Sequence, residues 1–172
     1  PLPEEDFDAI QIKLDEIGSP HSYTDIPWGW AQVGNTPLPW YKQDTHAGGV
    51  RVPMIVHYPP VIGDTGGVRG QFHHVTDLTP TILEVLDIQP TDRYRGYDQM
   101  PITGTSLAYS FDGKDCPTRK PIQYFEMTGK RALWLDGWMA VTRHESDDDY
   151  INEDWELYHL DEDFSQSNDL AA

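Results

Sequence analysis

Four short aromatic and β-branched segments near the C-terminus constrain the fold more than any other feature of this 172-residue sequence. Each holds five or six residues, and Gly or Asp residues separate one from the next; they are 122–126, 131–135, 138–142 and 155–160. This composition and spacing are typical of short antiparallel strands. Asp136-Gly137, between the second and third segments, is a strong signal for a two-residue hairpin turn. The sequence therefore predicts a small four-stranded antiparallel sheet.

Two segments of the N-terminal half have the pattern of helices. Apolar residues at positions 7, 10, 14 and 17 fall on one face of a helix over residues 7–17. Residues 79–86 open with Thr79, a good N-cap residue, followed by Pro80 at the first helical position. The sequence predicts both helices, the second more clearly than the first.

Two further segments of this half carry other patterns. Residues 50–59 form a short, nearly continuous apolar run closed by prolines, which predicts a buried strand centred on Met54 to Val56. Residues 21–45 contain many prolines and glycines together with Trp28, Trp30 and Trp40. We expect this second segment to be irregular but held in place, because long loops in compact proteins are usually functional or packed against a neighbouring layer.

The charge of the chain excludes some classes of partner. Twenty-nine acidic residues against 12 Lys and Arg give a formal charge of −17. Such a surface repels nucleic-acid phosphates and anionic lipids, so we expect neither nucleic acid nor a membrane as a partner. No apolar run approaches the roughly 18 residues of a membrane span. A single cysteine, Cys116, allows neither an internal disulfide nor a Cys-rich zinc site.

Three candidate functional sites are better explained by structural roles than by metal binding or catalysis. Residues 145–169 hold eleven acidic residues and no Lys or Arg, but the stretch from Asp161 lacks the Gly at loop position six and the Glu at position twelve that an EF-hand requires. A solvated acidic face is favoured there. Adjacent His73 and His74 point in different directions, so packing is favoured over metal binding. Cys116, although close to Arg119, is favoured as a turn residue over a nucleophile.

The segment 42–53 points more directly to chemistry. Lys42 ends an aromatic loop, and the pair Gly48-Gly49 that follows permits close approach of backbone segments. This arrangement can aim one fixed positive charge into a cleft. Without further information, a solvated surface lysine is the commoner alternative.

The pattern Lys-x-x-Thr-[Tyr/His]-x-Gly-Gly-[Val/Ile]-Arg-x-Pro over residues 42–53 resembles the sulfatase family, particularly bacterial arylsulfatases. His46 stands where many relatives have Tyr. Further matches follow in the order of the family, so that the resemblance covers residues 27–172. They are 74–84, 101–107, 123–127 with 136–138, and 155–171.

The resemblance implies an α/β fold of alkaline-phosphatase type, with α+β character in its C-terminal part. Residues 1–98 would be the end of the large mixed-sheet domain. Residues 99–172 would form a small C-terminal subdomain built on the four-stranded antiparallel sheet. The strands and helices predicted from the residues agree with this division.

The resemblance also implies hydrolysis of small-molecule sulfate esters by a formylglycine nucleophile and a calcium ion. Both are expected upstream of this chain, which would be the C-terminal part of a longer arylsulfatase, inactive without the rest of the sulfatase chain, and would hold no metal ligand itself. Lys42 would stabilise negative charge on the sulfate or the leaving-group oxygen, and His46 would border the substrate cleft. The compartment, bacterial cytoplasm or periplasm, stays open.

Some residues depart from the family pattern and keep alternatives open. Cys116-Pro117-Thr118-Arg119 places its Pro one position too early for a formylglycine motif, and no Asp-Asn-Gly pair for calcium is present. One alternative is a non-catalytic binding or interaction module. Another is a phosphatase or phosphonate hydrolase on the same scaffold.

Overall fold

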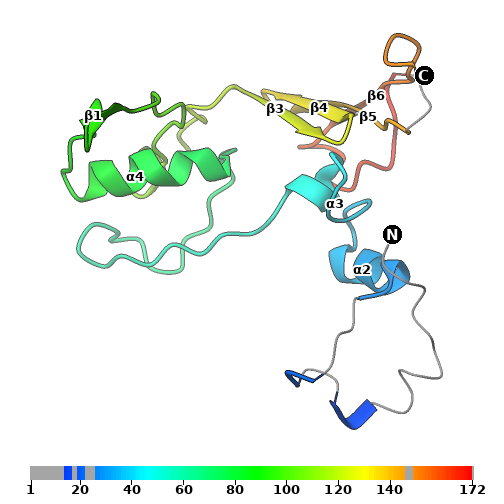
Figure 1. Ribbon diagram of the computed structural model, residues 1–172, viewed down its shortest axis with the longest axis horizontal. Coiled ribbons are helices and arrows are strands. Elements are labelled where there is room, and N and C mark those ends of the chain that lie inside the picture. The colour runs from blue at the N-terminus through cyan, green and yellow to red at the C-terminus, as the bar shows by residue number, and fades with distance from the viewer. Residues whose placement is uncertain (1–13, 17–18, 22–25, 146–148, 172) are drawn as a thin grey trace.

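The computed structural model describes residues 14–16, 19–21, 26–145 and 149–171 (Figure 1). It is a mixed α/β structure with a two-stranded and a four-stranded antiparallel sheet. None of the helices in these ranges is long and apolar enough to cross a membrane. In chain order the elements are η1 (Leu14–Glu16), α2 (Trp28–Asn35), α3 (Ala47–Val50), η2 (Val75–Asp77), α4 (Leu78–Val85), β1 (Arg93–Tyr94), β2 (Tyr97–Asp98), η3 (Ala108–Ser110), β3 (Ile122–Met127), β4 (Lys130–Leu135), β5 (Trp138–Thr142) and β6 (Glu156–His159).

The larger sheet confirms the prediction from the four aromatic segments. Its strands lie in the order β3-β4-β5-β6, and each is antiparallel to its neighbours. Asp136 and Gly137 both have positive φ, 46° and 86°, as a two-residue hairpin turn requires. Thr128 and Gly129, with φ of 51° and 91°, make a second such turn between β3 and β4 that sequence analysis did not single out.

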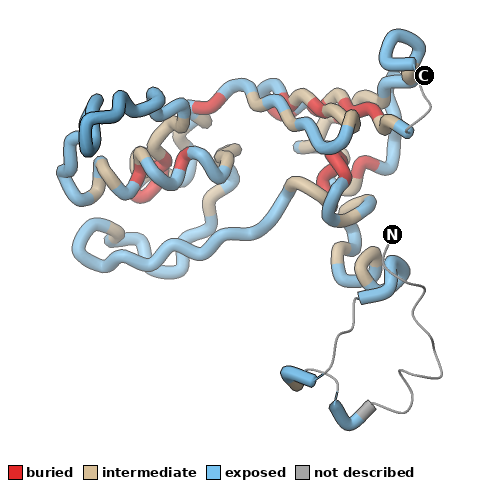
Figure 2. Tube along the Cα trace, viewed as in Figure 1, coloured by how far each residue is buried: buried red, intermediate tan, exposed pale blue. Residues whose placement is uncertain are grey.

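One face of this sheet carries the best-formed core. Ala132, Met139, Val141 and Tyr158 are buried together, and Val50 of α3 packs against them. Figure 2 shows this concentration of buried residues over the sheet and α3. Alternate residues of a strand share a face, so burial of positions 132 and 134 on β4, and of 139 and 141 on β5, follows from the pleat.

Helix α4 confirms the predicted helix, but it begins two residues before Pro80, the first helical residue predicted, and is not capped by Thr79. The preceding turn η2 runs directly into it, so Asp77 stands before the first helical residue. Asp77 is completely buried and accepts hydrogen bonds from the backbone N–H of His74 and Thr105 and from Lys120 Nζ, at 2.8, 2.8 and 2.9 Å. This carboxylate joins the start of α4 to the chain segment that enters β3.

Two expectations for the N-terminal half are wrong. Residues 51–58 are extended but belong to no strand, and Ile55 is 95% exposed, because no described segment pairs with them or covers them. Residues 28–35, expected to be irregular, form α2. The prolines there bracket the helix instead of interrupting it, with Pro27 directly before its first residue.

The remaining prediction concerns residues 7–17. Residues 14–16 form the single turn η1, whereas 7–13 and 17 lie outside the residues that the structure describes.

Candidate functional site

Lys42 lies in the turn between α2 and α3 and is exposed. Its ammonium group has no ion-pair or hydrogen-bond partner among the residues described. Trp40 and Gln43, on either side of it, have positive φ of 63° and 69°. Non-glycine residues adopt this left-handed conformation at an energetic cost, and the surrounding structure must hold them there. The loop therefore presents a free cation on a constrained backbone.

Close backbone packing fixes one side of this loop. Gly48 N donates to Pro39 O at 2.9 Å, and Asn35 Nδ2 donates to both Trp40 O and Gly48 O at 2.9 Å. A Cβ atom on Gly48 would lie 2.2 Å from the carbonyl oxygens of Pro39 and Trp40. The close approach predicted from the glycine pair is confirmed, and it stabilises the chain segment around Lys42.

A buried histidine fixes the other side. His46 is only 2% exposed, and its ring lies between two carboxylates. Nδ1 is 2.7 Å from Asp44 Oδ1, and Nε2 is 2.8 Å from Glu156 Oε2 at the start of β6. Figure 1 shows α3, which begins directly after His46, lying beside the sheet. That His46 borders the substrate cleft stays a prediction, and the contacts favour a different role that is developed below.

Two cations from the sheet complete the surroundings of Asp44. Lys130 Nζ and Arg143 Nε each lie 3.4 Å from Asp44 Oδ2, and Lys130 also donates to Gln43 O at 3.2 Å. The Arg143 guanidinium stacks over the Trp40 ring at 3.8 Å. Lys130 begins β4 and Arg143 follows β5. Lys130 and Arg143 therefore hold the Lys42 loop against one end of the sheet. They contact the Gln43 carbonyl, the Asp44 carboxylate and the Trp40 ring.

Burial and charge shift the pKa values of this cluster in opposite directions. Burial alone raises the pKa of Asp44, but hydrogen bonds from His46 and the nearby charges of His46 and Lys130 lower it to about 2. Burial alone lowers the pKa of His46, but its hydrogen bonds to Asp44 and Glu156 and their charges raise it above 6.5. The geometry therefore favours an ionised Asp44 and a protonated His46.

The sites interpreted as structural in the sequence are engaged in local contacts. Cys116 Sγ lies 2.7 Å from Gly113 O in a turn. His73 packs against the Tyr109 ring, and His74 Nδ1 is 2.9 Å from Thr76 Oγ1. Packing and turn roles describe all three side chains.

The acidic run is only partly the solvated face that was expected. Glu153 pairs with Arg131 and His144, and Glu156 pairs with His46. Across the part of the chain that the structure describes, no three His, Cys, Asp or Glu residues group into a metal site. The described residues therefore offer no group of oxygen ligands of the kind that holds a calcium ion.

Comparison with known proteins bears on this loop. The sulfatase family model matches residues 14–88, which include Lys42 and the glycine pair. The comparisons support a relationship between this chain and the sulfatase family. The chain is 29% identical over 160 residues to an uncharacterised sulfatase of Schizosaccharomyces pombe and 26% identical over 166 residues to a sulfatase of Formosa agariphila. These alignments cover 92% and 87% of this chain but 28% of each relative, so the chain spans about 28% of the curated relatives' length.

Sequence reasoning missed the carboxylates of this site. Asp44 lies two residues before His46, and Glu156 lies 110 residues after it in an acidic run. Only the fold brings Glu156 to the imidazole. The spacing of Asp44 and His46 was a local signal, but many loops carry such a pair without using it.

Proposed function

We propose that this chain contributes the anion-binding lysine of a sulfuric ester hydrolase of the arylsulfatase type. One observation carries the proposal: within a segment that matches the sulfatase family, Lys42 is a free cation on a loop fixed at both sides. In a chain with a formal charge of −17, an exposed lysine that pairs with no carboxylate among the described residues is well suited to an anionic substrate.

The chemistry of sulfate ester cleavage explains what this cation would do. Negative charge grows on the bridging oxygen as the S–O bond breaks, and it is already present on the sulfate oxygens. An ammonium group positioned beforehand stabilises that charge more in the transition state than in the ground state. The formylglycine nucleophile and the calcium ion of the proposed enzyme would come from residues outside this chain.

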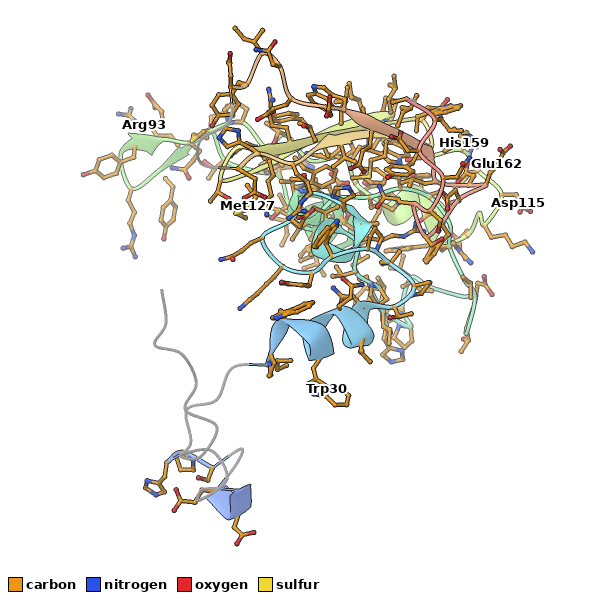
Figure 3. All side chains as sticks on the ribbon, turned by 90° about the vertical axis from the view of Figure 1, so that its right-hand side faces the viewer. Trp30, Arg93, Asp115, Met127, His159 and Glu162 are labelled. Atoms are coloured by element: carbon orange, nitrogen blue, oxygen red, sulfur yellow. The ribbon has the colours of Figure 1, made fainter. Side chains whose placement is uncertain are left out.

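The proposed partner of this chain is the rest of a sulfatase polypeptide. Residues 51–58 present apolar side chains to solvent, although such a run is normally covered. These side chains are Val52, Met54, Ile55, Val56 and Tyr58. Trp30 of α2 likewise projects away from the body of the molecule (Figure 3). Since the relatives are more than three times as long, the missing cover is proposed to be polypeptide of that kind, with residues 1–98 completing its large domain.

Substrate choice tests the proposal. The full-length protein that carries these residues is assayed with 4-nitrophenyl sulfate, 4-nitrophenyl phosphate and a phosphonate monoester. We expect the sulfate ester to have the highest kcat/KM. A preference for the phosphate or the phosphonate ester would assign the chain to a relative with a different reaction. Absence of turnover with all three, in protein shown to be folded, would favour the non-catalytic alternative.

A further inference from the structure

We infer that His46 is a positioning residue whose doubly protonated ring ties the Lys42 loop to strand β6. This inference rests on the proposed function, because the loop matters to turnover only if Lys42 does. It adds a role for a buried cation, and for a carboxylate in the acidic run, that neither family likeness nor sequence spacing assigns.

Hydrogen-bonding capacity decides the protonation of the ring. A carboxylate can only accept hydrogen bonds, and a neutral imidazole has one N–H to donate. His46 has a carboxylate oxygen within 2.8 Å of each ring nitrogen. A neutral ring would leave one nitrogen lone pair facing a carboxylate oxygen in a buried place, which is unfavourable. The imidazolium satisfies both contacts.

Cations and a hydroxyl donor surround the two carboxylates that contact His46. Lys130 and Arg143 face Asp44 from β4 and from the end of β5. On the other side, Tyr158 donates its hydroxyl proton to Glu156 Oε2 at 2.6 Å, from the same strand β6. Each carboxylate therefore already has a donor besides His46. A protonated ring between two such groups is the arrangement that their charges favour.

The ties at His46 act directly on the constrained part of the loop. Asp44 Oδ1 accepts from His46 N at 3.0 Å as well as from its ring, and the next residue, Ala47, donates its N–H to Gln166 Oε1 at 2.7 Å. Gln43, one residue before Asp44, holds a φ of 69°. Loss of the ring contacts would let Gln43 relax, and Lys42 would move with it.

A double-mutant cycle measures this coupling in the full-length protein. We expect His46→Gln to lower kcat about 10- to 100-fold, the usual loss when a reacting group is misplaced by about 1 Å. In a Lys42→Ala background the same change should have less than about a threefold effect, because both changes disable one function. The matched control is His21→Gln, an exposed histidine outside the loop, which should leave kcat unchanged. Equal effects of His46→Gln in both backgrounds would overturn the inference.

A spectroscopic measurement keeps the inference separate from the proposed function. In 15N NMR of the full-length protein, His46 should show two protonated ring nitrogens at pH 7. Glu156→Gln, a milder change than replacing the histidine, should lower the pKa of His46. A singly protonated ring at pH 7, or a pKa that Glu156→Gln does not lower, would refute the positioning role even if Lys42→Ala abolishes turnover. Conversely, if Lys42→Ala leaves kcat unchanged while His46 is doubly protonated, the assignment of Lys42 to the reaction is refuted. The contacts of His46 with Asp44 and Glu156 would still stand.

The contribution of His46 to stability should decrease as the pH rises. Because folding raises the pKa of His46, its contribution to stability is complete below the unfolded value near 6.5 and is lost as pH rises through the folded pKa. The activity of the wild-type protein should therefore carry an alkaline limb that His46→Gln removes. An unchanged limb in His46→Gln would contradict the inference.

Discussion

The four-stranded sheet and the extended segment 51–58 have similarly apolar sequences but opposite surroundings. In the sheet, Ala132 and Val141 are fully buried, because neighbouring strands and α3 supply the covering atoms from within the chain. In the extended segment, Val52 and Ile55 are 80% and 95% exposed. An apolar run is buried only where its partners are present. One face of the sheet is therefore covered from within the chain, whereas no described segment covers residues 51–58.

Other contacts join the sheet to the part of the chain around α4. Lys120, two residues before β3, forms a buried ion pair with Asp77, the residue that precedes α4. Phe72 stacks on Trp134 of β4, with ring centroids 3.8 Å apart and planes within 10°. In Figure 1, α4 lies at the left and the sheet lies toward the right, and these contacts join them.

The largest effect is expected from breaking the ion pair. Lys120→Met would leave Asp77 buried without its cation and should lower the free energy of unfolding by about 3–5 kcal/mol. Urea unfolding measures this loss. Lys114→Met, at an exposed lysine nearby, is the control and should change stability by less than about 0.5 kcal/mol. Similar stabilities for the two variants would show that the two regions are not joined through Asp77.

The stability lost in Lys120→Met should decrease as the pH falls. Burial alone raises the pKa of Asp77, but backbone hydrogen bonds from His74 and Thr105 and the charge of Lys120 lower it. Its stabilising contribution is therefore present above the unfolded value near 3.8 and is lost as pH falls through the folded pKa. The difference between wild type and Lys120→Met should shrink in that acid range.

A paired truncation tests the comparison itself. Met139→Ala, in the core of the sheet, should destabilise the 172-residue chain by about 2–5 kcal/mol. Ile55→Ala should change the stability of that chain by less than about 0.5 kcal/mol, because its side chain is already in water. In a protein as long as the relatives, we expect Ile55→Ala to cost as much as Met139→Ala. A small effect of Ile55→Ala there would show that nothing covers the segment.

A smaller effect is expected from the glycines of the Lys42 loop. Gly49→Ala would place a Cβ atom 2.0 Å from Asp44 O and should destabilise the chain by about 1–3 kcal/mol. Gly34→Ala is the matched control, because nothing lies within 4 Å of its Cβ position in α2 and alanine favours a helix by up to about 1 kcal/mol. Opposite signs in thermal unfolding are the expected result. A stabilising Gly49→Ala would contradict the close packing of the loop.

The sequence predictions were correct where the structure depends on neighbouring residues and failed where it depends on segments far apart in the chain. The strands β3 to β6 and the turn at Asp136-Gly137 were predictable because their signals are local: aromatic and β-branched content, separating Gly and Asp residues, and a residue pair suited to positive φ. The strand expected at 50–59 did not form because a strand needs a hydrogen-bonded partner, and no described segment pairs with it.

The same contrast between local and long-range interactions applies to the candidate site. Lys42 and the glycine pair were selected from the sequence because a short pattern over residues 42–53 resembles a family motif, although the residues alone favour a solvated lysine. The tie from His46 to Glu156 could not, because it joins residues 110 positions apart through the packing of α3 on the sheet. Positive φ at Trp40 and Gln43 was also unpredictable, since neither residue type favours it.

The most direct test of the account is the turnover of 4-nitrophenyl sulfate by Lys42→Ala in the full-length protein. We expect kcat to fall by about 10²- to 10³-fold, the usual loss for one group that stabilises transition-state charge. Lys114→Ala, an exposed lysine outside the loop, should keep wild-type kcat. A well-folded Lys42→Ala whose kcat stays within about threefold of wild type would contradict the assignment of Lys42 to the reaction.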